Sequence, residues 1–108
     1  MTDPSKGLGA LNDAERNLVR QCLNAAVAGP FFPDWEFRTL FGIERRDVAE
    51  VLERWPDLDD ARQVDALAIN NSLNNLWGYP HRLEDHWSEF IDAPRNEVLR
   101  VFMKWRGD

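Results

Sequence analysis

Hydrophobic residues recur at helical spacing along most of the chain and predict six helical segments. In the first segment, Asn12 and Glu15 have the spacing of a capping box at the start of a helix. Gly29 and Pro30 end this segment. The five later segments are predicted near residues 34–41, 45–55, 60–77, 83–91 and 94–106.

The segment near residues 60–77 carries hydrophobic residues on two nearly opposite sides. A helix of this kind is usually buried between neighbours, so we expect it to be the central one. No alternating run typical of a strand is present. We therefore expect an all-α fold, a single compact bundle of about five to six short helices around the segment at residues 60–77. Residues 11–108 are expected to form one helical domain after a flexible lead-in at residues 1–10.

The amino-acid composition limits the size of the core and the cellular compartment that we expect for the protein. The chain has 108 residues, of which 44% are hydrophobic, which suffices for one core. The single cysteine, Cys22, excludes an internal disulfide, and the first residues lack the basic and apolar parts of a signal peptide. Eleven arginines against two lysines are typical of a GC-rich bacterial genome. We expect a cytoplasmic protein without membrane attachment.

The formal charge of −6 is concentrated in one part of the chain, because residues 34–65 carry ten acids against five arginines. Such a segment repels nucleic acid and attracts cationic surfaces. We therefore expect a non-catalytic module that docks a basic, toxin- or nuclease-like protein, as an immunity protein or antitoxin does. The analogy is one of size and charge, and the alternative is a face that only keeps the protein soluble. The residues predicted to bind the partner are Glu50, Glu53, Trp55, Asp57, Asp59 and Asp60.

A second candidate site is the row of amides Asn70, Asn71, Asn74 and Asn75 within the predicted central helix. Asparagine is a poor helix former, so four in six residues indicate that the amides are used. They could tie neighbouring loops to the helix, which we favour, or line a pocket for a polar small molecule.

Residues 34–55 resemble a helix-turn-helix unit, with Gly42 in the turn and apolar residues one, six and nine positions later. This resemblance implies, as an alternative function, a small helical regulatory protein. Arg38 stands where such a motif usually has a small residue, and the second helix is acidic. We therefore do not expect nucleic acid as a partner.

The remaining candidates have structural explanations. Core packing accounts for most of the aromatic stretch Phe31–Phe41, although an exposed binding patch there is the alternative. The five tryptophans fall in separate segments, which favours a core role for most of them. His81 and His86 are five residues apart and do not converge on a helix, so no metal site is expected. No nucleophile has a histidine and a carboxylate at a recognisable spacing, and we expect neither catalysis nor a cofactor.

Overall fold

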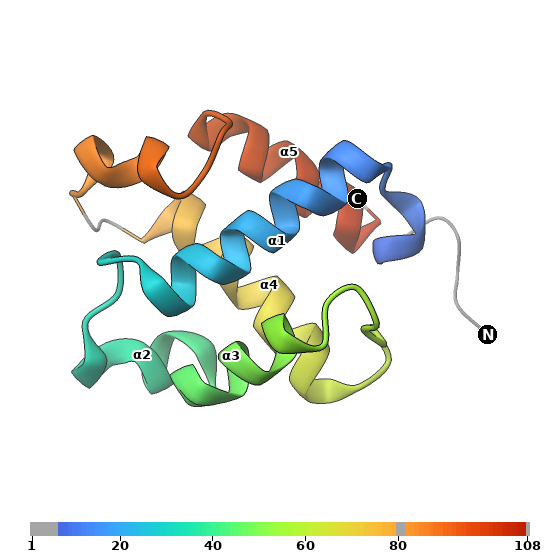
Figure 1. Cartoon of the computed structure of the whole chain (residues 1–108), viewed down its shortest axis with the longest axis horizontal. Coiled ribbons are helices and arrows are strands. Elements are labelled where there is room, and N and C mark those ends of the chain that lie inside the picture. Colours follow the sequence, from blue (N-terminus) through green and yellow to red (C-terminus); the bar gives the residue numbers. More distant parts are fainter. Residues whose placement is uncertain (1–6, 80–81, 108) are drawn as a thin grey trace.

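The computed structural model describes residues 7–79 and 82–107, and the fold over these residues is all-α (Figure 1). No strand occurs among them, which confirms the predicted fold class. Two short segments are 3-10 helices, labelled η. The elements in chain order are η1 (Leu8–Ala10), α1 (Asp13–Ala28), α2 (Asp34–Phe41), α3 (Arg45–Glu53), α4 (Gln63–Gly78), η2 (Glu84–Glu89) and α5 (Arg95–Arg106).

Local signals set most of the helix boundaries. The Asn12 side chain accepts a hydrogen bond from the Glu15 N–H, and the Glu15 carboxylate accepts one from the Asn12 N–H, so the predicted capping box forms. Helix α2 ends as predicted at Gly42, whose φ of 73° is the left-handed conformation that glycine adopts without strain.

Two elements differ from the prediction. Helix α4 starts at Gln63, because the residues before it form a turn in which the Asp59 carboxylate accepts a hydrogen bond from the Ala61 N–H. The segment near residues 83–91 forms the 3-10 helix η2, which is shorter and more tightly wound than the predicted helix.

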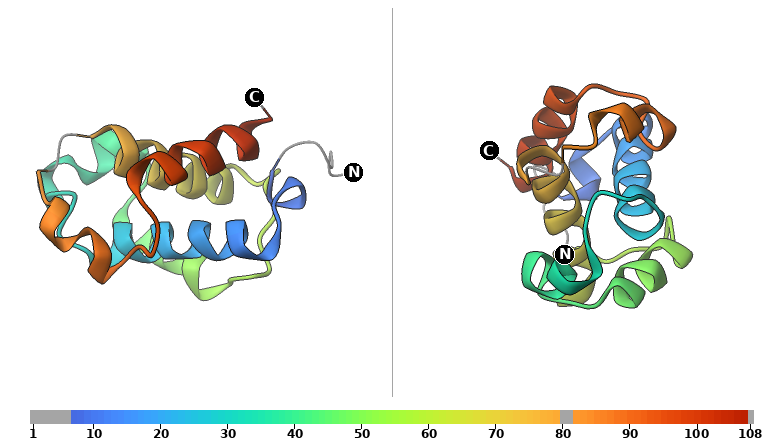
Figure 2. Two further views of the ribbon diagram at one scale, coloured as in Figure 1. Left: turned by 90° about the horizontal axis from the view of Figure 1, so that it is seen from above. Right: turned by 90° about the vertical axis from the view of Figure 1, so that its left-hand side faces the viewer.

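Helix α4 is the central helix, because it packs against α1, α2, α3 and α5. Seen from above, α1 lies on one side of the molecule, and α4 and α5 lie together on the other (Figure 2). Ala68, Ile69, Leu73 and Leu76 of α4 are fully buried. Its second apolar side, which includes Val64 and Leu67, is only partly covered.

The aromatic residues divide between the core and the surface. Phe31, Phe32, Phe37 and Phe41 are buried, whereas Trp35 between them is 79% exposed. Three of the five tryptophans pack against the core, as expected for most of them, but none is fully buried. Trp55, Trp87 and Trp105 are partly buried at its edge, and Trp77 is 37% exposed. An indole carries an N–H that needs a partner, which favours positions at the edge of a core.

None of the helices in the described part of the chain has the length and apolar character needed to cross a membrane.

Candidate functional site

Four exposed carboxylates lie on α3, at the bottom of Figure 1, and on the connection from α3 to α4, at its lower right. Glu50 and Glu53 project from α3, and Asp57 and Asp59 follow on the connection. We call these four residues the acidic surface. Two exposed arginines, Arg46 and Arg62, belong to the same part of the chain, so the six side chains carry a net charge of −2 (four acids, two arginines).

The carboxylates of the acidic surface form no ion pair within the described residues. Most of the other exposed acids do form ion pairs. For example, Asp34 lies 2.5 Å from Arg45, and Glu44 lies 3.2 Å from Arg38. The acidic surface therefore keeps charge that the rest of the fold does not compensate.

Arg54, in the same part of the chain, pairs with the buried Asp65, and its interaction with Glu50 of the acidic surface is the weaker one. The Arg54 guanidinium donates to both oxygens of the fully buried Asp65, at 3.0 and 2.6 Å. The Asp59 N–H donates to the same carboxylate at 3.0 Å. Hydrogen bonding to Arg54 lowers the pKa of Asp65, which stays ionised. This network fixes the connection on α4 and uses the charge of Arg54 internally.

Asp60 and Trp55, which the sequence also placed among the partner-binding residues, are less accessible than the other four. The Asp60 carboxylate is turned inward, where it accepts a hydrogen bond of 2.5 Å from the Leu8 N–H. Burial raises its pKa. Trp55 is partly buried against the core, so only part of its indole is accessible.

The amides of the Asn70–Asn75 row do not act together. The Asn71 side chain donates to the Phe41 carbonyl at 2.7 Å, and the Asn75 side chain donates to the Leu40 carbonyl at 3.1 Å. These carbonyls belong to the last turn of α2, where no partner within the helix exists. Asn70 donates to the Asn71 side chain, and Asn74 is exposed. Two of the four amides therefore hold α2 on α4.

Helices α2 and α3 are joined by a short turn through Gly42, as in a helix-turn-helix unit. The Arg38 side chain, at the position where that motif has a small residue, is 79% exposed and bonds to Glu44. The exposed side of α3 carries Arg46, Glu50 and Glu53. This net negative face is unfavourable for a phosphate backbone.

The residues considered for metal binding or catalysis do not form a site in the described structure. His86 lies 2.6 Å from Glu89, and His81 lies outside the described residues. No group of three potential metal ligands occurs in the described ranges. Burial raises the pKa of the Cys22 thiol, which is fully buried and therefore stays protonated.

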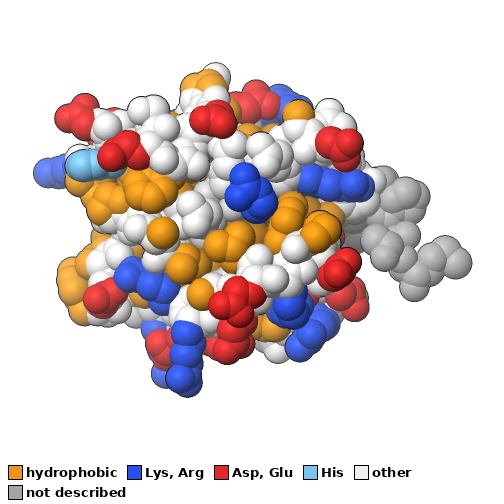
Figure 3. Space-filling model, viewed as in Figure 1, with side chains coloured by type: hydrophobic (Ala, Val, Ile, Leu, Met, Phe, Trp, Pro, Cys, Tyr) orange, Lys and Arg blue, Asp and Glu red, His pale blue; other side chains and the backbone are white. Residues whose placement is uncertain are grey.

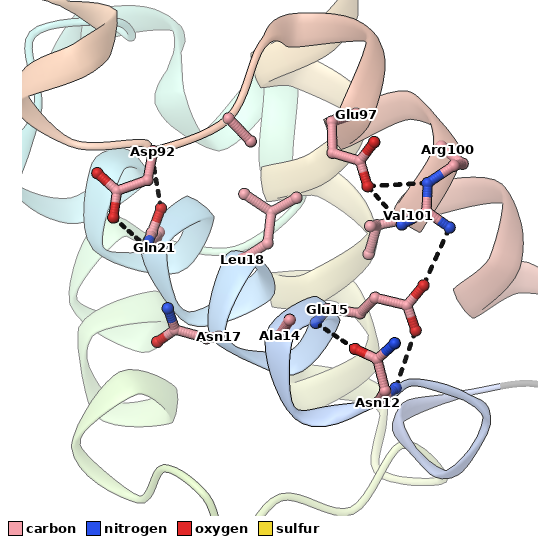
Figure 4. Close-up of a pocket in the computed structure, with 11 residues that line it drawn as sticks. Asn12, Ala14, Glu15, Asn17, Leu18, Gln21, Asp92, Glu97, Arg100 and Val101 are labelled. Atoms are coloured by element: carbon pink, nitrogen blue, oxygen red, sulfur yellow. Dashed lines mark hydrogen bonds and ion pairs between the residues drawn. The ribbon is translucent and has the colours of Figure 1, made fainter.

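A groove of about 310 Å³ between α1 and α5 was not predicted from the sequence (Figure 4). Its walls combine residues from the start and first half of α1 with residues just before α5 and in the first half of α5. These segments are more than 70 positions apart in the chain. No local sequence pattern could therefore predict that they lie side by side in the fold. On the face shown in Figure 3, uncharged side chains occupy much of the middle, and most charged ones lie towards the edge.

Comparisons with known protein families, with curated proteins and with solved structures give no match to this chain.

Proposed function

We propose that the protein is a non-catalytic binding module whose acidic surface docks on a basic face of a partner protein. The observation that carries this proposal is the absence of ion pairs at Glu50, Glu53, Asp57 and Asp59 in the described structure, where most other exposed acids are paired. A carboxylate that already has an ion-pair partner contributes little to the binding of a second cation. A carboxylate without one can interact with a cation of the partner protein through its full charge.

The physical role of the acidic surface is to guide association. Unpaired charges of one sign on a small surface raise the rate at which an oppositely charged partner docks. This effect weakens with salt, because charges are screened over about 8 Å at physiological ionic strength. Trp55 supplies a partly exposed aromatic group beside these charges, and such groups contribute strongly to binding once they are covered. A basic toxin or nuclease is the class of partner that fits this surface.

The test compares two variants of equal net charge. In the first, the acidic surface is neutralised by Glu50→Gln, Glu53→Gln, Asp57→Asn and Asp59→Asn. In the control, four exposed acids elsewhere are neutralised by Asp34→Asn, Glu84→Gln, Asp85→Asn and Glu89→Gln. A basic protein captured by the native chain from a lysate at low salt is then purified, and its association rate with each variant is measured.

We expect the association rate to fall by about tenfold or more for the first variant and much less for the control. Added salt should slow association of the native chain and change that of the first variant little. Equal rates for the two variants would show that the overall charge, and not this surface, drives docking.

A further inference from the structure

Helices α4 and α5 lie side by side on the side of the molecule away from α1 (Figure 2). They run in opposite directions. The start of α5 lies at the end of α4, where Arg95 donates to the Tyr79 carbonyl at 3.5 Å. The end of α5 lies near Asp60, just before α4, because the segment around η1 bonds to both.

The spacing of residues in α4 places three side chains on its side towards α5. Asn71 and Asn75 bond to the end of α2, and α5 lies on the other side of α4 in the right-hand view of Figure 2. Ala66, Asn70 and Trp77 are four and seven positions apart and share this other side. All three are partly or well exposed.

The spacing in α5 turns two apolar side chains away from α1. Arg100 and Lys104 bond to Glu15 of α1. Leu99 and Met103 each precede one of these cations, so they lie about 100° further around the helix. Leu99 is partly exposed, and Met103 is 45% exposed.

Together these residues form an accessible surface without charge. Among the described residues, Trp77 and Met103 are two of the three large hydrophobic residues that are exposed. Helix α4 has sixteen residues, and its one charged residue, Asp65, is fully buried. We call this surface the α4–α5 face, and it consists of Ala66, Leu67, Asn70 and Trp77 of α4 with Leu99 and Met103 of α5.

The charge of the chain indicates what covers this face. Each molecule carries a formal charge of −6, so two copies that meet through charged surfaces repel one another. A symmetric dimer joins the same patch on both subunits, and such a patch must be complementary to itself. Uncharged apolar side chains meet this requirement, as does the amide of Asn70, because an amide can both donate and accept. A basic protein, in contrast, finds no anionic group on the α4–α5 face.

We propose that the protein forms a two-fold symmetric dimer through the α4–α5 face. Trp77 and Met103 supply the large apolar groups that become buried. The contact comes from two short helices, so we expect a dissociation constant in the micromolar range. The α4–α5 face is separate from the acidic surface, which lies on α3 and the connection after it.

Sedimentation equilibrium of the full chain between about 5 and 500 µM tests for this dimer. We expect a monomer–dimer equilibrium that shifts towards the dimer when sodium chloride rises from about 0.05 to 0.5 M, because salt screens the repulsion between two acidic molecules. Docking through the acidic surface responds to salt in the opposite direction. A chain that stays monomeric throughout, or a dimer that salt weakens, would overturn the proposal.

Two matched variants locate the interface. Met103→Glu and Trp35→Glu each replace an exposed hydrophobic residue and make the net charge more negative by one, but Trp35 lies on α2, outside the α4–α5 face. We expect Met103→Glu to raise the dissociation constant at least about tenfold, and Trp35→Glu to change it less than about threefold.

Met103→Gln separates the effect of charge from that of shape. It has no charge, so we expect it to weaken the dimer less than Met103→Glu does. Circular dichroism of each variant checks that the helices are intact. If Trp35→Glu weakens the dimer as much as Met103→Glu, the interface is not the α4–α5 face.

Discussion

Both oxygens of the Glu15 carboxylate are used within the fold. One accepts hydrogen bonds from the Asn12 N–H and from Lys104, each at 2.8 Å, and the other accepts from Arg100 at 3.0 Å. Glu15 is only 5% exposed. Its hydrogen bond to Lys104 and its other donors lower the pKa from 4.5 to about 2. A single side chain thus caps α1 and joins it to α5.

We predict that Glu15→Gln lowers the free energy of unfolding by about 1–3 kcal/mol near neutral pH, because hydrogen bonds to a buried charge are lost. The pKa of Glu15 is lower in the folded state than in the unfolded state. Its stabilising contribution is therefore complete above about pH 4.5 and is lost as the pH falls towards 2. Urea unfolding at neutral pH and at about pH 3 should show a smaller difference between variant and native protein in acid.

The control for Glu15 is Glu53→Gln, which removes an exposed carboxylate without an ion pair in the described structure. We expect it to change stability by less than about 0.5 kcal/mol. A Glu15→Gln cost that is the same at both pH values would contradict the assigned pKa.

At the scale of elements, α2 depends on α4 for its C-terminal end. The side chain of Asn75, which is almost fully buried, bonds to the Leu40 carbonyl and to the Asn71 carbonyl one turn earlier in α4. Asn74 is adjacent in sequence but exposed. Asn74 and Asn75 are the same residue type in the same helix but differ in burial. Asn74→Ala is therefore a suitable control for Asn75→Ala.

We predict that Asn75→Ala lowers the free energy of unfolding by about 1–3 kcal/mol, because it leaves a carbonyl of α2 without its partner in a buried place. Asn74→Ala should be neutral or stabilising by up to about 0.7 kcal/mol, since alanine is the better helix former. Thermal or urea unfolding of both variants measures the difference. Equal effects would mean that the contact between Asn75 and α2 does not contribute to stability.

The sequence predicts features that depend on residues close together in the chain, and it does not predict contacts between residues far apart in the chain. The capping box of Asn12 and the end of α2 at Gly42 involve residues within four positions of each other, and both were predicted. The contact of Asn75 with Leu40 spans 35 positions. The poor helix propensity of asparagine indicated that the amides are used, but it could not identify their partners. Likewise, nothing local distinguishes the inward-turned Asp60 from the exposed Asp59.

At the scale of the whole molecule, Asp60 and the segment around η1 join distant parts of the chain. The Asp60 carboxylate accepts a hydrogen bond from the Leu8 N–H, and the Gly7 N–H donates to the Trp105 carbonyl at 2.6 Å. The segment around η1 is thereby held against the end of α5 (Figure 1). Burial raises the pKa of Asp60, so its ionised form is disfavoured in the folded protein.

Because this pKa is raised on folding, the favourable contribution of Asp60 is present at low pH and is lost as the pH rises through the folded-state value. We predict that Asp60→Asn, which removes the charge and keeps an acceptor for Leu8, is at least as stable as the native protein at neutral pH. Asp60→Ala should be less stable by about 1–2 kcal/mol and should speed amide exchange at Leu8. Greater stability of the alanine variant than of the asparagine variant would refute this role.

The central position of α4 has a consequence for how the protein unfolds. Four helices each bury part of their surface on this one, so opening any of them exposes core residues that the others share. Such an arrangement leaves little room for a partly unfolded intermediate, and unfolding is expected to be cooperative. The amides in the middle of α4 should exchange with solvent only when the whole domain unfolds, and their exchange rates then report the global stability of the protein.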